Sequence, residues 1–129
     1  MKIFNQAKQT NADITICKSC SFDTHTQQLL PSQWMLQTEN LPGVVFAPFE
    51  IKDDLFQFTY GWPWDKLYRT EFVKKNQLCY PPLMNSEDLV FVFESLAIAK
   101  KISILDYICV YHRINRSQSV SNTRDSQPE

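Results

Sequence analysis

Two adjacent carboxylates, Glu87 and Asp88, have the most readily defined chemistry in this sequence. They follow Asn85 and Ser86, which are typical N-cap residues, and they precede a strongly apolar run. The pattern therefore predicts that both occupy the first turn of a helix. A carboxylate held there can take a proton from a hydroxyl group as that hydroxyl attacks. The alternative interpretation is that the two residues only stabilise the positive end of the helix, by ~0.3–1 kcal/mol each.

A second group of candidates lies earlier, in a loop that contains one glycine and one proline. Trp62, Trp64 and Lys66 follow one another there at alternate positions. Indole rings stack on the C–H faces of sugars, and a lysine can donate hydrogen bonds to hydroxyl or phosphate oxygens. Asp65 belongs to the same segment. The alternative interpretation is that the tryptophans anchor the loop on the core and that Asp65 pairs with a neighbouring basic residue at the surface.

A third group of polar residues follows the last apolar segment. Arg113, Arg116 and Ser119 lie in a stretch rich in serine and arginine, and guanidinium groups bind phosphate oxygens through paired hydrogen bonds. A solvated polar tail is the alternative for the arginines. His112 precedes them and is either a metal ligand or a side chain packed against the core.

Composition excludes several classes of function. The net charge of −1 over 129 residues gives no general electrostatic case for binding nucleic acid. With only two glycines, the chain cannot form a glycine-rich phosphate-binding loop. The apolar runs are shorter than a membrane span, and the N-terminus lacks the apolar stretch of a signal peptide. We therefore expect a cytoplasmic protein with reduced cysteines.

Four cysteines leave one further alternative open. Cys17 and Cys20 have the spacing of zinc and redox sites, but the chain has no second pair with this spacing. Buried strand thiols are the preferred interpretation, and a zinc-dependent binding domain is the weakest of the functions considered.

The elements that must position these residues alternate between helix and strand. Helices are predicted over residues 2–10, 48–59, 70–76 and 86–101. Strands are predicted over 12–21 and 102–114, with short extended pieces around 29–30, 44–46 and 65–68. The strand at 102–114 is apolar on both faces, which predicts an interior position in a layered α/β structure. Residues 1–114 are expected to form the folded unit and 115–129 a flexible tail.

Three segments, in this order and spacing, resemble bacterial family-2 glycosyltransferases. The segments that carry the resemblance are Trp64-Asp65-Lys66-Leu67-Tyr68-Arg69, then Asn85-Ser86-Glu87-Asp88-Leu89-Val90-Phe91, then Tyr111-His112-Arg113 with Ser117-Gln118-Ser119. The resemblance implies the acceptor-side, C-terminal half of a Rossmann-like GT-A domain, with a mixed sheet flanked by helices. It also implies inverting transfer of a sugar from a nucleotide-diphosphosugar to a glycan or a lipid-linked acceptor at the inner face of the membrane.

The same resemblance assigns roles to the candidates. Asp88 would be the catalytic base, and Glu87 beside it would form hydrogen bonds with sugar hydroxyls. The substrate would be held by Trp64, Asp65, Lys66, Arg113, Arg116 and Ser119.

One part of the family's pattern has no counterpart in this sequence. The Asp-x-Asp segment, which in the family holds the donor and a divalent Mn or Mg ion, does not occur. We therefore expect no cofactor within the chain, dependence on a donor-binding half or partner chain, and self-association of the uncovered face. A non-catalytic α/β remnant or binding module is the alternative function.

Overall fold

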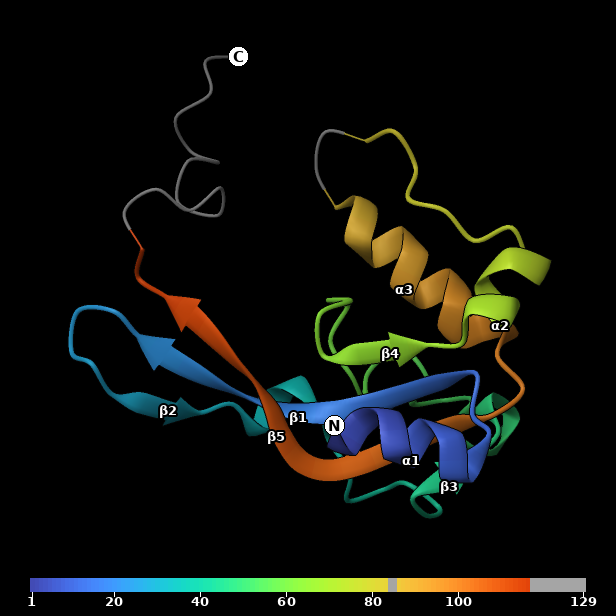
Figure 1. Cartoon of the computed structure of the whole chain (residues 1–129), viewed down its shortest axis with the longest axis horizontal. Coiled ribbons are helices and arrows are strands. Elements are labelled where there is room, and N and C mark those ends of the chain that lie inside the picture. The colour runs from blue at the N-terminus through green and yellow to red at the C-terminus, as the bar shows by residue number, and fades with distance from the viewer. Residues whose placement is uncertain (84–85, 117–129) are drawn as a thin grey trace.

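Two long parallel strands, β1 (Ile14–Asp23) and β5 (Ile102–Ile114), run side by side through the computed structural model, which describes residues 1–83 and 86–116 (Figure 1). On its other edge β1 pairs antiparallel with β4 near its start and with β2 near its end, and β3 pairs antiparallel with the start of β5. The remaining elements are α1 (Lys2–Thr10), β2 (Leu29–Pro31), the 3-10 helix η1 (Gln33–Met35), β3 (Val45–Phe46), the 3-10 helix η2 (Pro48–Ile51), β4 (Lys66–Tyr68), α2 (Thr70–Lys75) and α3 (Glu87–Ile98). The predicted class, a mixed sheet flanked by helices, is confirmed.

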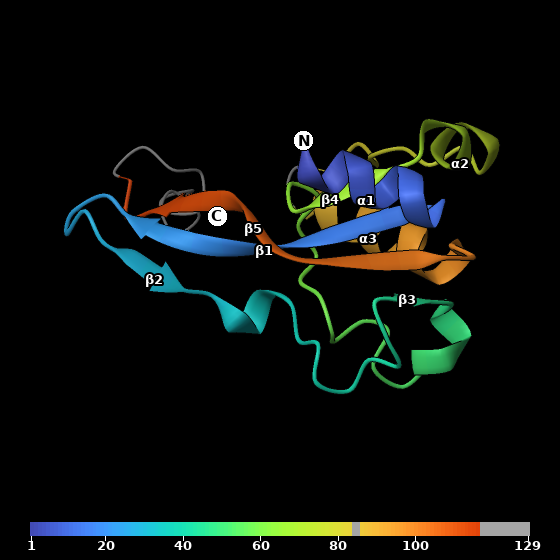
Figure 2. The same ribbon diagram turned by 60° about the horizontal axis from the view of Figure 1, so that its bottom comes forward.

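The core forms because the first halves of both long strands are buried on both faces. Ile14 and Ile16 of β1 alternate toward the apolar cluster, while Thr15 faces the other way and shares a 2.8 Å hydrogen bond with Ser103 of β5. Helix α3 adds an apolar stripe to the same cluster. The buried residues of α3 are Phe91, Val92, Ser95 and Leu96. Figure 2 shows the two long strands extending beyond this core, with α1 and α2 on one side of them and β3 on the other.

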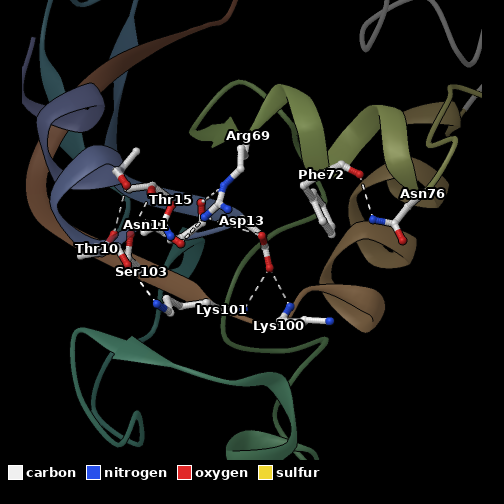
Figure 3. A network of polar contacts seen from close by, with 12 residues as sticks. Thr10, Asn11, Asp13, Thr15, Arg69, Phe72, Asn76, Lys100, Lys101 and Ser103 are labelled. Atoms are coloured by element: carbon white, nitrogen blue, oxygen red, sulfur yellow. Dashed lines mark hydrogen bonds and ion pairs between the residues drawn. The ribbon is translucent and has the colours of Figure 1, made fainter.

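A polar corner joins three connections that meet at the start of the sheet (Figure 3). The Asp13 carboxylate accepts hydrogen bonds from the backbone N–H groups of Lys100 (2.8 Å) and Lys101 (3.2 Å), just before β5. Arg69, between β4 and α2, lies 3.8 Å from Asp13 and donates to the carbonyl oxygen of Ala12 (3.2 Å). These bonds fix where the start of α2 and the C-terminal end of α3 attach to the sheet.

Most predicted elements are confirmed, but the helix over 48–59 is wrong. The chain there forms η2 and then successive turns, in which Asp54 N–H donates to Ile51 (2.8 Å) and Phe58 N–H to Asp54 (3.0 Å). Ile51, Leu55 and Phe58 are buried, whereas Phe56 is 52% exposed, so only part of the expected apolar face packs on the core. Adjacent aspartates compete for backbone hydrogen bonds and favour turns over a helix interior, which explains the outcome.

Three further observations concern the ends and faces of elements. Arg69 is the N-cap residue of α2, and Thr70 is its first helical residue. Helix α3 is strongly apolar, yet Val90 and Ile98 on its outer face are 43% and 41% exposed. Beyond Ser103, β5 pairs only with β1 among the described residues, so its second half is an edge and not an interior strand. No helix in the described ranges is long and apolar enough to cross a membrane.

Candidate functional site

A buried ion pair organises the loop that precedes β4. Both side chains of Asp65 and Lys66 are fully inaccessible, and Lys66 Nζ lies 2.7 Å from Oδ1 of Asp65. The same ammonium donates to the carbonyl oxygens of Tyr60 (2.8 Å) and Trp62 (2.7 Å). Burial raises the pKa of the Asp65 carboxyl and lowers that of the Lys66 ammonium, and each partner's charge opposes the effect on the other.

These contacts change the role expected for Asp65 and Lys66. Substrate binding was expected of both, but all three N–H donors of Lys66 are already used within the protein. A direct bond from Lys66 to a substrate would have to break one of them. Oδ2 of Asp65 is buried and has no hydrogen-bond partner among the described residues. The pair therefore holds the loop in shape and does not present its charges to solvent.

The loop contributes three rings to a continuous cluster of five, called here the aromatic platform: Trp34, Tyr60, Trp62, Trp64 and His112. Trp64 stacks on His112 (5.0 Å between ring centroids, 10° between planes) and on Trp62 (5.0 Å, 23°). Trp34 meets Tyr60 edge-on at 5.3 Å and Trp62 at 5.6 Å. Three distant segments, η1, the loop before β4 and the end of β5, thus present their rings together.

The aromatic loop lies against the first turn of α3. A Cβ added to Gly61 would overlap Cδ2 of Leu89 and come within 3.4 Å of the ring of Phe93. Leu89 directly follows Asp88, so this contact puts the two candidate segments of the sequence side by side. Asp88 and Glu87 are both half-buried in the first helical turn, as predicted.

Gly61→Ala tests this contact. We expect the free energy of unfolding to fall by about 1–2 kcal/mol, because Leu89 or the loop must move to admit the methyl group. Gly43→Ala is the matched control, since nothing lies within 4 Å of a Cβ there, and its effect should stay within about 0.5 kcal/mol. Urea unfolding of the three proteins gives both values. Equal stability for the two variants would show that the loop does not rest on α3.

Two tyrosines pack on α3 close to its first turn, which carries Asp88. Phe91, one turn further along α3, is stacked on Tyr80 (4.4 Å between centroids, 15°) and meets Tyr68 edge-on at 5.1 Å. Burial raises the pKa of both phenols, and the negative charge of Asp88 raises each further. The charge of Asp88 is therefore in electrostatic reach of both phenol groups.

The C-terminal candidates separate onto different faces. His112 belongs to the aromatic platform; its Nδ1 is buried without a hydrogen-bond partner in the described structure, and burial lowers its pKa. Arg113 is exposed and follows it on the strand, so its side chain points to the opposite face of β5. Arg116 is exposed beyond the end of β5. Ser119 lies outside the described residues.

The described residues do not form a metal site. Residues 1–83 and 86–116 contain no group of three or more histidine, cysteine, aspartate or glutamate side chains that could hold an ion. Cys17 donates a hydrogen bond to the carbonyl oxygen of Asp65, just before β4 (3.3 Å), and Cys20 donates one to that of Leu30 in β2 (3.2 Å). The two thiols therefore bond to different segments of the chain. Burial raises the pKa of Cys17 to about 12, which leaves it a thiol. Among the described residues, Cys17 and Cys20 therefore do not belong to a zinc ligand set.

A cavity of about 570 Å³ adjoins the platform at Trp64. It lies between the start of α1 and the second half of β5, and its walls include Tyr107, Tyr111 and Cys109. Trp64 therefore borders both the ring stack and a space large enough for a small ligand.

Sequence reasoning missed two members of the platform, Trp34 and Tyr60. Trp34 lies in a polar, turn-rich stretch and carries no motif, yet its side chain is 51% exposed. The available signal was its type alone, since a large aromatic residue in a polar segment needs a partner or a ligand.

Comparison with known proteins relates the chain to glycosyltransferases. It is 30% identical over 131 residues to the cholesterol galactosyltransferase of Borreliella burgdorferi, a match that covers 94% of this chain and 35% of the relative. No family model matches. The chain thus spans about a third of the length of this relative.

Solved structures share the fold. TarS of S. aureus (residues 1–349) in complex with UDP-GlcNAc superposes with a TM-score of 0.65 and 18% identity, covering 93% of this chain and 32% of TarS. The complex with UDP gives 0.61 and 18%, covering 88% and 30%. In both comparisons the match spans about a third of the TarS chain.

Proposed function

We propose that this chain, a relative of glycosyltransferases, forms the acceptor-side half of an inverting family-2 glycosyltransferase of the GT-A type. The observation that carries the proposal is the contact of the aromatic loop with the first turn of α3, at Gly61 and Leu89. This contact supports the proposal because the loop that carries the aromatic rings packs on the helical turn that carries Asp88, and indole rings suit sugar faces while a carboxylate can take a proton from a hydroxyl.

We assign the following roles to the residues. Asp88 removes the proton of the acceptor hydroxyl as its oxygen attacks the anomeric carbon, the bond to the diphosphate breaks, and the configuration inverts. Glu87 binds sugar hydroxyls beside it. Trp64 forms the wall of the acceptor site, and the Asp65–Lys66 pair holds that wall in place. Arg113, Arg116 and Ser119 are assigned to the diphosphate.

The donor requires residues beyond those described. TarS has been crystallised with UDP and with UDP-GlcNAc, which supports a nucleotide-diphosphosugar donor for this chain. We assign the donor, and the Mn or Mg ion that would neutralise its diphosphate, to a donor-binding half or partner chain. A glycan or a lipid-linked acceptor at the inner face of the membrane completes the proposal.

A chimera tests the proposal. Residues 1–129 replace the matched segment of the B. burgdorferi relative, and release of nucleoside diphosphate is measured with a panel of nucleotide sugars and of glycan and lipid acceptors. We expect acceptor-dependent turnover by the chimera and none by the relative with that segment deleted. Circular dichroism and nucleotide-sugar binding verify that the chimera is folded. A folded chimera that binds the donor but transfers no sugar would contradict the catalytic role.

A further inference from the structure

We propose that the outer part of the aromatic platform, Trp34 with Tyr60, is a second acceptor subsite that binds a pyranose ring next to the one that receives the sugar. The proposal rests on the function proposed above and names its acceptor class: a carbohydrate of at least two residues, free or attached to a lipid. Neither residue belongs to the segments that carry the family resemblance.

The platform has a protected end and an open end. Trp62, Trp64 and His112 are half-buried and nearly parallel, with ring planes 10° to 34° apart. Trp34 and Tyr60 at the other end are 51% and 43% exposed. Trp62 contacts all four other rings, so Trp34 and Tyr60 add an exposed surface that is continuous with the stacked rings.

Both exposed rings are held on a rigid support. Met35, next to Trp34, is buried and accepts a hydrogen bond from the Ser19 hydroxyl through its sulfur (2.8 Å). The Tyr60 N–H donates to the carbonyl oxygen of Met35 (3.1 Å), and the Tyr60 carbonyl accepts from Lys66. Backbone hydrogen bonds thus join η1 directly to the aromatic loop. A surface that is already fixed before its ligand arrives loses little conformational entropy on binding, and this favours affinity. A loop without a binding role has no need of such rigidity.

The chemistry of the open end favours a sugar over a wholly apolar molecule. Exposed indole and phenol faces suit the C–H face of a pyranose, and the indole N–H and the phenol hydroxyl can bond to its hydroxyls. Gln33 and Gln37, both exposed, flank Trp34 in the sequence and add amide donors and acceptors. A sterol placed here would leave these polar groups without partners.

Binding of mono- and oligosaccharides to the full chain tests the subsite without donor or turnover. The probes are glucose, galactose and N-acetylglucosamine and the linear trisaccharides of each, with tryptophan fluorescence and NMR titration as readouts. We expect at least one trisaccharide to bind more tightly than its monosaccharide. Trp34→Ala should weaken that trisaccharide about 2- to 10-fold and leave the monosaccharide unchanged. Trp34→Phe keeps an aromatic ring and should keep most of the affinity difference between the trisaccharide and its monosaccharide.

Two controls make the result specific. Phe49→Ala removes a 77% exposed aromatic residue outside the platform and should change neither affinity. Glu94→Gln removes an exposed carboxylate of α3 and should also leave binding intact. The binding assay needs neither donor nor turnover, so failure of the subsite and failure of the proposed transfer can be told apart. No advantage of any trisaccharide over its monosaccharide, an advantage that survives Trp34→Ala, or binding of cholesterol delivered from cyclodextrin in place of sugars, would each overturn the proposal.

Discussion

Lys66→Met should lower the free energy of unfolding by about 3–5 kcal/mol, because it leaves the Asp65 carboxylate buried without its counter-ion. The substitution keeps the volume of the side chain and removes only the ammonium group. It also removes the donors that hold the carbonyl oxygens of Tyr60 and Trp62 (2.8 and 2.7 Å). The aromatic loop should loosen together with the loss of stability, which tryptophan fluorescence would report alongside urea unfolding.

The pH dependence separates loss of the charge partner from loss of packing. Burial raises the pKa of Asp65 in the folded protein, and without Lys66 only a hydrogen bond from the backbone N–H of Asp65 itself opposes this effect. Because the pKa of the Asp65 carboxyl is higher in the folded than in the unfolded protein, the stability that this group contributes is fully present below its unfolded pKa of about 3.9. This contribution is lost as the pH rises through the folded pKa. The difference between Lys66→Met and the wild type should therefore be largest near pH 8 and smaller near pH 4, where only the loss of the bonds to Tyr60 and Trp62 remains.

Lys18→Met is the matched control for this experiment. Lys18 also pairs with an aspartate, Asp106, but their side chains are 39% and 77% exposed. Solvent and salt screen such a pair, so its loss should cost less than about 1 kcal/mol with little dependence on pH. Replacing both buried partners, as Asp65→Leu with Lys66→Met, should recover part of the loss. Similar effects of Lys66→Met and Lys18→Met would contradict the view that the buried pair supports the loop.

The sequence predicted the elements better than it predicted what they bury. Strand 102–114 and the helix that begins at Glu87 carry strong local signals, and both lie where the pattern places them. The second half of β5 was expected to be interior, because its residues are apolar on both faces. Whether an apolar strand is covered depends on what pairs with its edge, and no local pattern contains that information.

The candidate site shows the same limit. The adjacent pair Asp65–Lys66 was expected to act at the surface, but the two side chains bond to each other and Lys66 also bonds to the carbonyl oxygens of Tyr60 and Trp62, so the pair is buried under the loop. Trp34 reaches the platform only because η1 is joined through Met35 to the loop before β4. Side chains brought together from three segments have no common spacing, so sequence reasoning found the loop and the helix start and missed the outer rings.

Asp88→Asn in the active chimera should lower kcat by about 10²- to 10⁴-fold, the usual contribution of a general base. The amide keeps the shape of the carboxylate but cannot accept the proton of the acceptor hydroxyl. Helix α3 should still form, since the loss of one charge from its first turn costs only ~0.3–1 kcal/mol. Transfer rates and urea unfolding, measured on the same preparations, separate loss of chemistry from loss of fold.

Glu94→Gln provides the control for this change, because it removes an exposed carboxylate from the same helix away from the aromatic loop. Its kcat and KM should stay within about twofold of the parent chimera, since a solvated charge so placed neither holds the acceptor nor reaches the reacting oxygen. If Asp88→Asn behaves like Glu94→Gln, the base must lie elsewhere. A fall in kcat with unchanged acceptor affinity would instead mean that the first turn of α3 stabilises the transition state, while the aromatic platform binds the acceptor in the ground state. The contact between Gly61 and Leu89 joins these two parts of the site.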